Sequence, residues 1–190
     1  MELIFASHNE NKVKEIRSVL PDSIQLLSLN DIGFHQEIEE TGSTLEENSK
    51  IKAETIYKET GKNVFADDSG LFVEALNGDP GVFSSRYAGT GNSEDNIKKL
   101  LNELNSKEIR KAYFQSVFCI IIDGEIHYVS GEVHGEIINE PRGNQGFGYD
   151  PIFVADGHEK TFGELDPAQK NQISHRFKAV QKLINFIGNL

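Results

Sequence analysis

The stretch AYFQSVFCIIIDGEIHYVSGEVHGEII, residues 112–138, decides the fold class of this chain. It consists of two β-rich runs, residues 112–122 and 125–138, which are separated by the dipeptide Asp123-Gly124. An Asp-Gly pair favours a two-residue hairpin turn, because both central positions of that turn need a positive φ. The segment therefore predicts a long antiparallel hairpin in the middle of the chain.

Strands and helices alternate before this hairpin. Residues 1–6 lack the basic region and the long apolar stretch of a signal peptide, and they predict a first strand. Asn9 can cap a helix that follows it, and a short strand is expected at residues 24–29. The expected apolar face of this first helix is Val13, Ile16, Val19 and Leu20.

A second helix and a third strand are expected next. The stretch Thr44-Leu45-Glu46-Glu47 fits a capping box, which starts a helix over residues 45–59 that Gly61 ends. Residues 63–66 predict a buried strand. This strand is expected to stop at Asp67-Asp68-Ser69-Gly70, because two adjacent acids and a glycine break its apolar run.

Two more helices are indicated by their caps and apolar faces. A loop over residues 77–92 leads to a helix capped at Asn92 or Ser93, and Asp166-Pro167 is a good start for a terminal helix. The expected packed faces are Ile97, Leu100, Leu101 and Leu104 in the first, and Ile173, Phe177, Val180, Leu183, Ile184 and Ile187 in the second.

The order of these elements predicts a mixed sheet. Strands that alternate with helices favour parallel pairing, whereas the central hairpin is antiparallel, and helices are expected to cover the sheet. We therefore expect an α/β fold over residues 1–190 as one domain. Its elongated central sheet would be flanked by helices, with two lobes and an active-site cleft between them.

Composition excludes several classes of protein. A formal net charge of −11 argues against broad binding to a nucleic-acid backbone. No apolar run approaches the length that spans a bilayer, and the first residues do not resemble a signal peptide. We expect a cytoplasmic protein that binds neither membranes nor nucleic acid. The single cysteine, Cys119, lies in an apolar run and is expected to be a small buried hydrophobic residue.

The common nucleotide and zinc motifs are absent. Gly146-Phe147-Gly148 resembles half of a dinucleotide fingerprint but lacks the third glycine and the following helix. Gly61-Lys62 lacks the upstream glycine of a phosphate loop. The six histidines form no His-Glu-x-x-His pattern, and one cysteine makes a structural zinc site improbable.

Acidic and basic side chains mark a different kind of site. The acids Glu39, Glu40, Asp67 and Asp68 offer the hard oxygen ligands that Mg²⁺ prefers, although taken alone they are equally often solvated surface charge. The candidate cations are Lys12, Lys52, Lys170, His175 and Arg176, each of which alone is more often a surface residue.

The turn Ser7-His8-Asn9 precedes the first helix. Its hydroxyl, its amide and the backbone N–H groups at the positive end of the helix make a place for a phosphate. The simpler interpretation is that Asn9 only caps the helix.

Several short motifs, spread over essentially the whole chain, resemble those of the inosine triphosphate pyrophosphatase family, also known as the dITP/XTP pyrophosphatases. They are Ser7-His8-Asn9-Glu10-Asn11-Lys12, Glu39-Glu40-Thr41-Gly42, Ala66-Asp67-Asp68-Ser69-Gly70-Leu71, Phe147-Gly148-Tyr149-Asp150-Pro151-Ile152-Phe153 and Ser174-His175-Arg176. Residues 80–89 also resemble the family's Pro-Gly…Ser-Ala-Arg-Tyr loop, with Ser85 where alanine is commoner, and His8 stands where the family often has a small residue.

This resemblance implies a Mg²⁺-dependent enzyme that cleaves ITP, dITP and XTP to the monophosphate and pyrophosphate, and it implies a homodimer. Asp68 would act as the base and, with Glu40, would hold Mg²⁺, while Glu39 and Asp67 lie nearby. The substrate-binding residues that it implies are Ser7, His8, Asn9, Glu10, Asn11, Lys12, Lys52, Ser69, Phe147, Gly148, Tyr149, Asp150, Lys170, His175 and Arg176. Among these, Phe147 would stack on the purine, and Asp150, His175 and Arg176 would lie near its hydrogen-bonding edge, with Lys170 close by.

Three other functions compete with this one. A Maf-like pyrophosphatase with another substrate preference is opposed by residues 147–150 and 174–176. A nucleotide-binding regulator without turnover is opposed by the presence of Glu40, Asp68 and Lys12. A purely structural role predicts no metal-dependent activity at all.

Overall fold

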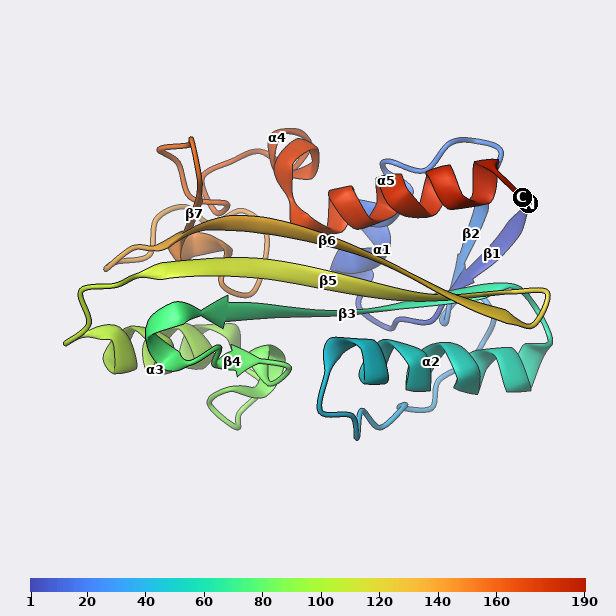
Figure 1. The fold of residues 1–190 in the computed structure, drawn as a ribbon, viewed down its shortest axis with the longest axis horizontal. Helices are drawn as coiled ribbons and strands as arrows, with labels where there is room; N and C mark the ends of the chain where they lie inside the picture. Colours follow the sequence, from blue (N-terminus) through green and yellow to red (C-terminus); the bar gives the residue numbers. More distant parts are fainter. The chain divides into compact units, whose positions relative to one another are not determined.

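The computed structural model describes residues 1–190, and the chain divides into two compact units. Unit 1 consists of Met1–Asp68, Ser116–Gly131 and Arg176–Leu190, and unit 2 of Ser69–Gln115 and Glu132–His175. Both units contain parts of the same three strands, which are β3 (Val64–Val73), β5 (Lys111–Ile122) and β6 (Glu125–Ile137) (Figure 1). The division agrees with the expectation of two lobes.

The strands form a mixed sheet, as the sequence predicts. Their order is β2-β1-β3-β5-β6-β7, and β4 pairs with β3. Strand β1 (Glu2–Phe5) is parallel to β2 (Gln25–Ser28) and to β3. Strands β4 (Pro80–Gly81) and β7 (Phe153–Ala155) are antiparallel to β3 and β6, respectively. The α/β class with helices around a central sheet is confirmed.

The turn between β5 and β6 has the geometry that its sequence predicts. Asp123 has a φ of 50° and Gly124 a φ of 88°, so both central residues are left-handed. This is the pattern of the two-residue hairpin turn whose twist matches the flanking strands. The predicted hairpin is confirmed.

Replacing Gly124 with alanine is expected to destabilise the fold by about 1–2 kcal/mol, because a Cβ is unfavourable in the left-handed region. Urea unfolding measures this loss. Gly188→Ala is the matched control, since Gly188 has a negative φ and its added Cβ meets no atom within 4 Å. An equal loss in both variants would show that the turn conformation is not the cause.

Unit 1 has hydrophobic packing on both faces of its strands. Helices α1 (Glu10–Arg17) and α5 (His175–Gly188) pack with Phe65 and Phe118 on one face. Helix α2 (Leu45–Thr60) packs with the neighbouring residues Ala66 and Cys119 on the other, and Figure 1 shows α2 and α5 on opposite sides of the strands. Because successive side chains of a strand point to opposite faces, the apolar run of β5 serves both layers. The expectation of a buried Cys119 is confirmed.

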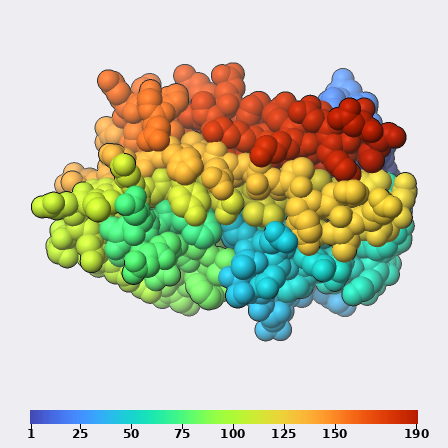
Figure 2. All heavy atoms as spheres, viewed as in Figure 1, coloured from blue at the N-terminus to red at the C-terminus, as the bar shows by residue number.

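Helix α5 also covers the part of β6 that belongs to unit 1. Figure 2 shows the atoms of the C-terminal helix against those of β6. The ring centroids of His127 in β6 and Phe186 in α5 are 4.5 Å apart. The helix is thereby packed along the hairpin.

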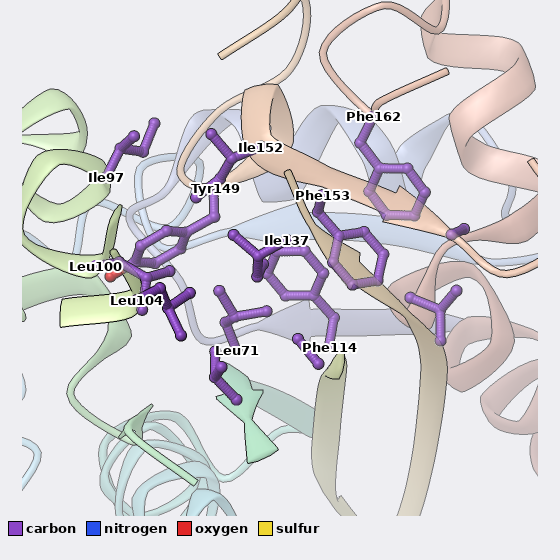
Figure 3. Packing of buried hydrophobic residues seen from close by; sticks show 14 of the residues in the cluster. Leu71, Ile97, Leu100, Leu104, Phe114, Ile137, Tyr149, Ile152, Phe153 and Phe162 are labelled. Atoms are coloured by element: carbon purple, nitrogen blue, oxygen red, sulfur yellow. The ribbon is translucent and has the colours of Figure 1, made fainter. Parts of the chain in front are cut away.

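Unit 2 has its own core (Figure 3). Leu100 and Leu104 of helix α3 (Ser93–Leu104) belong to it, and so do Phe114 of β5 and Phe153 of β7. The rings of Phe114 and Phe153 meet edge to face, with centroids 4.8 Å apart, a favourable arrangement for aromatic pairs. The cap of α3 at Asn92 is as predicted.

The predicted first helix and terminal helix differ from the observed ones. Helix α1 ends at Arg17, so Val19 and Leu20 lie in the turn that follows, where Pro21 disfavours a continued helix. The predicted terminal helix is two helices, α4 (Pro167–Ile173) and α5. The break falls at Ser174, whose extended backbone, with φ −68° and ψ 154°, interrupts the helical run.

The prediction that the third strand stops at Asp67 was wrong. Strand β3 runs from Val64 to Val73 and carries Asp67 and Asp68 in its middle. The strand continues because the charges of both acids are compensated by neighbouring side chains, and because Leu71 and Val73 are again buried core residues.

The predicted loop over residues 77–92 also holds regular structure. Strand β4 lies within it, and so does the 3₁₀ helix η2 (Ser84–Arg86). A further 3₁₀ helix, η1 (Glu74–Leu76), comes before it, and η3 (Asp150–Ile152) leads into β7. The other predicted boundaries agree with the structure to within about one residue. Helix α2 has the predicted Thr44 and Glu47 capping box and the left-handed Gly61. None of the helices is long and apolar enough to cross a membrane.

Candidate active site

The turn between β1 and α1 is organised by its own side chains. The backbone N–H groups of Asn11 and Lys12 donate to Asn9 Oδ1 at 3.1 and 3.2 Å. The N–H of Asn9 donates to Ser7 Oγ at 3.2 Å. These three backbone donors are thus bonded within the turn, and the place for a phosphate there stays a prediction. The simpler interpretation, in which Asn9 caps the helix, describes this geometry, and Lys12 contributes its side chain.

The other predicted residues of this turn lie at the surface. His8, Glu10 and Asn11 are exposed. His8 Nε2 lies 3.0 Å from the carbonyl oxygen of Gln36, and Glu10 accepts a hydrogen bond from Asn30. These contacts hold the turn against the segment that precedes Glu40.

A buried acid pairs with two cations in unit 1. Lys12 Nζ lies 3.0 and 2.9 Å from the two carboxylate oxygens of Asp67, and Arg176 Nε lies 3.6 Å from Asp67 Oδ2. The side chain of Asp67 is 1% exposed. Burial acts to raise the pKa of Asp67, but Lys12 and Arg176 outweigh it and hold this pKa well below its usual range. Arg176 also pairs with Glu15 of α1.

A second buried acid lies beside Lys52. Lys52 Nζ donates to Glu40 and lies 3.9 Å from Asp68 Oδ1. Asn48 Nδ2 donates to the other oxygen, Asp68 Oδ2, at 3.1 Å. Burial raises the pKa of Asp68, while the surrounding carboxylates raise the pKa of Lys52 against the effect of its burial. Lys52 is therefore charged and is shared by two acids.

We refer to these unit 1 residues together as the charged cluster. Its members are Lys12, Glu40, Lys52, Asp67, Asp68 and Arg176. All except Arg176 come from β3, from α1 and α2, or from the segment before α2, and Arg176 is the second residue of α5. The structure thus brings together the predicted Lys12, Lys52, Glu40, Asp68 and Arg176.

The carboxylates of the charged cluster fit a magnesium ion better than a zinc ion. The structure gathers no group of three or more His, Cys, Asp or Glu side chains that would make a complete metal site. Mg²⁺ does not need one, because it keeps several waters and takes one or two carboxylates beside substrate phosphates. Glu40 and Asp68, which share the ammonium of Lys52, supply two such carboxylates. Glu39, by contrast, is exposed.

In unit 2 a second set of predicted residues meets around Asp150. The N–H of Phe147 and Nζ of Lys170 both donate to Asp150 Oδ2, at 2.8 and 2.7 Å. Lys170 Nζ also lies 4.7 Å from the centroid of the Phe147 ring. Gly146 has a φ of 75°, and a Cβ there would lie 2.0 Å from Asp150 Oδ2. The glycine is required for this close approach, and we call residues 146–150 the Phe147 turn.

Two predicted site residues belong to the core of unit 2. Tyr149 is buried, and its hydroxyl donates to the carbonyl oxygen of Ser84 at 2.8 Å. His175 stacks on Phe114, with centroids 4.9 Å apart and an angle of 12° between the rings. Both side chains therefore support the fold where they stand. Gly148 has a φ of 61°, which fits the tight turn.

Three predicted cations of the last two helices are buried, although each alone is more often a surface residue. Lys170, His175 and Arg176 are 4%, 4% and 3% exposed. Along the chain, the two units meet at peptide bonds inside the predicted motifs, one between Asp68 and Ser69 and one between His175 and Arg176. The same short motifs thus supply residues to both units.

Sequence reasoning missed two residues that contact the charged cluster, Asn48 and Glu15. Asn48 lies four residues before Lys52 on α2, and Glu15 lies three residues after Lys12 on α1. Residues at these spacings share a helix face. Helix periodicity applied to the two predicted lysines was the signal that would have found both.

Residues 3–186 match the model of the Ham1 family. The chain belongs to the Ham1 family. The predicted family resemblance is thereby confirmed over almost the whole chain.

Curated relatives of this Ham1-family chain match it from end to end. A protein of Flavobacterium psychrophilum named dITP/XTP pyrophosphatase is 50% identical over 190 residues, which is 100% of both chains. A Bacillus licheniformis protein of the same name is 52% identical over 187 residues, covering 96% of this chain and 95% of the relative.

Solved structures of Ham1 proteins have the same fold. The Ham1 protein of Staphylococcus aureus has a TM-score of 0.90 and 42% identity, and the match covers 100% of this chain and 99% of that one. The HAM1 protein of Coxiella burnetii has a TM-score of 0.92 and 42% identity, with full coverage of both chains.

Proposed function

We propose that this protein hydrolyses the noncanonical purine triphosphates ITP, dITP and XTP to the nucleoside monophosphate and pyrophosphate. A full-length relative that is 50% identical carries the name dITP/XTP pyrophosphatase, which supports the substrate class. The observation that carries the proposal is the charged cluster, in which buried carboxylates stand beside lysines that are themselves largely buried. Removing these substrates keeps deaminated purines out of the nucleotide pool.

Lys12 and Lys52 would bind the triphosphate. A lysine ammonium is a compact point charge that suits phosphate oxygens, and it stabilises the charge that grows on them as the bond breaks. Both ammonium groups already lie among carboxylates, which keep Lys52 protonated and hold Lys12 at a fixed place. Little reorganisation is then needed when the substrate binds.

Asp68 would act as the general base. It would take a proton from the water whose oxygen attacks the α-phosphorus. A bond forms between that oxygen and the α-phosphorus, the bond from the α-phosphorus to the bridging oxygen breaks, and pyrophosphate leaves with that oxygen. Asn48 and Lys52 contact different oxygens of Asp68. They support this role because they fix the orientation of the Asp68 carboxylate.

We further propose that the reaction depends on Mg²⁺. Glu40 and Asp68 would hold the ion, together with waters and substrate phosphates. When bound, Mg²⁺ supplies positive charge that stabilises the phosphate oxygens and the leaving pyrophosphate. Removal of divalent ions with EDTA is expected to abolish activity, and added Mg²⁺ is expected to restore it.

The Phe147 turn would bind the purine. Phe147 offers an aromatic face, and Lys170 and Asp150 place a donor and an acceptor beside it. Hypoxanthine and xanthine carry an oxygen at position six that accepts a hydrogen bond, whereas adenine carries an amino group. Donors directed at that position would leave the amine of ATP facing another donor, and such buried mismatches discriminate strongly.

Phe147→Ala is expected to lower kcat/KM for ITP by about 10- to 100-fold, since stacking of a base on an aromatic ring contributes about 1–3 kcal/mol. Most of the loss should appear in KM, because stacking is present before and during the reaction. Steady-state kinetics with ITP measures it. Tyr128→Ala, which removes a ring that is 39% exposed in unit 1, is the control. Unchanged kinetics in Phe147→Ala would remove Phe147 from the site.

The proposed function is tested by pyrophosphate release from ITP, dITP, XTP, ATP, GTP and a modified pyrimidine triphosphate, with and without Mg²⁺, and by measuring the binding of the same nucleotides. Rapid release from ITP, dITP and XTP with slow release from ATP and GTP would support it. Release from modified pyrimidine triphosphates instead would favour a Maf-like enzyme. Tight binding without release would favour a regulator, and neither binding nor release would leave a structural role.

The family resemblance also carries the proposal of a homodimer in the cytoplasm. Sedimentation equilibrium would give a mass near twice 21.2 kDa for a dimer.

A further inference from the structure

Asn48 is a neutral side chain that contacts Asp68, the base in the proposed function. It lies on α2 and is 0% exposed. Its Nδ2 donates to Asp68 Oδ2 at 3.1 Å, and its Oδ1 accepts from the N–H of Gly42 at 2.8 Å. One side chain thus joins the base to the segment that carries Glu40.

The two contacts fix which way the Asn48 amide faces. An ionised carboxylate only accepts hydrogen bonds, so the NH₂ group must face Asp68. The backbone N–H of Gly42 only donates, so the amide oxygen must face Gly42. The reversed orientation would lose both hydrogen bonds, and the amide is therefore held in one orientation.

Gly42 allows this arrangement because it has no side chain. A Cβ at position 42 would lie 2.6 Å from Glu47 Cβ and 2.7 Å from Asn48 Oδ1. Both distances are shorter than real Cβ contacts, and both neighbours are held by hydrogen bonds of the α2 start. The motif that contains Glu40 thus ends in the residue that lets its backbone reach Asn48.

Asn48 and Lys52 divide the two oxygens of Asp68 between them. Lys52 Nζ is 3.9 Å from Oδ1 and Asn48 donates to Oδ2. Lys52 follows Asn48 by four residues, so one face of α2 presents both groups. Lys52 also binds Glu40. Two side chains of α2 therefore set the position of Asp68 relative to Glu40.

We propose that Asn48 is a positioning residue, which holds the Asp68 carboxylate in its reactive orientation and ties it to the Glu40 segment through Gly42. This inference rests on the proposed function. It adds a residue that touches neither the substrate nor the reacting water and that acts on the rate through Asp68.

The test compares Asn48→Ala with the wild type in steady-state pyrophosphate release from ITP. The expected result is a fall in kcat of about 10- to 100-fold. This is the usual effect of losing a residue that orients a site residue without contacting the substrate. KM should change little, because Lys12 and Lys52 remain to bind the triphosphate. Asn48→Asp should fall at least as far, since it replaces the donor with a second carboxylate beside Asp68.

The matched control is Asn96→Ala. Asn96 is 3% exposed on α3, its Oδ1 accepts from the N–H of Ala88 at 2.7 Å, and its Nδ2 donates to the carbonyl oxygen of Ser85 at 3.1 Å. It therefore loses the same number of buried hydrogen bonds in the same kind of helix, but none to a carboxylate. We expect a similar loss of thermal stability with an unchanged kcat.

A second measurement reads the contact without turnover. The side-chain NH₂ signal of Asn48 in a ¹⁵N–¹H spectrum, assigned by its absence in Asn48→Ala, should shift in Asp68→Ala. It should not shift in Asp31→Asn, because the Asp31 carboxylate accepts from Ser28 and not from Asn48. No shift in Asp68→Ala would overturn the inference. If the wild type releases pyrophosphate and Asn48→Ala has the same kcat, the inference is overturned as well. If the wild type releases no pyrophosphate, the proposed function itself is refuted.

Discussion

Asp68→Asn is expected to lower kcat for pyrophosphate release from ITP by about 10²- to 10⁴-fold, the range that general base catalysis contributes. The amide has the size of the carboxylate but cannot take a proton from water. Its oxygen can still accept from Asn48 Nδ2, so the fold around it should persist. The loss is expected in kcat more than in KM, because the proton transfer occurs only as the water attacks.

Asp31→Asn is the control for this exchange. Asp31 Oδ2 accepts from the N–H and the hydroxyl of Ser28, both at 2.7 Å, and Asp31 also pairs with Arg17. These contacts, the backbone hydrogen bond first, lower the pKa of Asp31. Loss of its charge should cost some stability and leave kcat unchanged. If Asp68→Asn keeps the wild-type rate, Asp68 is not the base and the proposed mechanism fails.

The sequence was sufficient to predict the sheet class because the deciding signals are local. Asp123-Gly124 demands a turn whose φ values are both positive, and the structure has them. Likewise the capping box at Thr44 and Glu47 starts α2 where it was expected. Such signals lie within four consecutive residues and do not depend on tertiary contacts.

The course of β3 could not be predicted in the same way. Two adjacent acids end most strands, since a buried charge is costly without a partner. Here Asp67 is paired with Lys12 from α1 and Arg176 from α5, which are 55 and 109 residues away along the chain. Only the tertiary structure brings these partners to the strand, so a local pattern predicts an end where the strand continues.

The candidate site shows the same limit. The family motifs identified the charged residues Lys12, Glu40 and Asp68, and the structure brings them into one cluster with Lys52. They did not identify Asn48, because it lies outside the motifs and carries no charge, so that only its spacing from Lys52 on α2 marks it. Tyr149 shows the converse, since a residue inside a motif can serve the core.

Asp67→Asn is expected to destabilise the fold by about 3–5 kcal/mol, the usual effect of removing one partner from a buried ion pair. Asp67 has a side chain that is 1% exposed, and its charge compensates those of Lys12 and Arg176. Asparagine keeps the shape and leaves both cations without that charge. Urea unfolding of the wild type and the variant at neutral pH measures the difference.

Glu2→Gln provides the contrast, because it also breaks a carboxylate–lysine pair in unit 1. Glu2 and Lys62 are 2.8 Å apart, but their side chains are 41% and 56% exposed. An exposed pair contributes at most about 1 kcal/mol. The two variants differ in burial more than in chemistry, so a similar loss in both would show that burial does not set the strength of the Asp67 pairs.

The double variant Asp67→Asn with Lys12→Met separates loss of charge compensation from loss of packing. If the penalty arises because Lys12 is left buried without its acid, replacing the ammonium with the thioether of methionine should restore part of the stability that Asp67→Asn removes. Arg176 keeps its pair with Glu15 in both variants. A double variant that is less stable than Asp67→Asn alone would show that Lys12 contributes to the fold through its packing.

The same double variant should lose turnover completely, since it lacks the lysine assigned to the triphosphate. The change at Lys12 would then raise stability and abolish catalysis. This is the expected result where a buried charge serves substrate binding at a cost in stability.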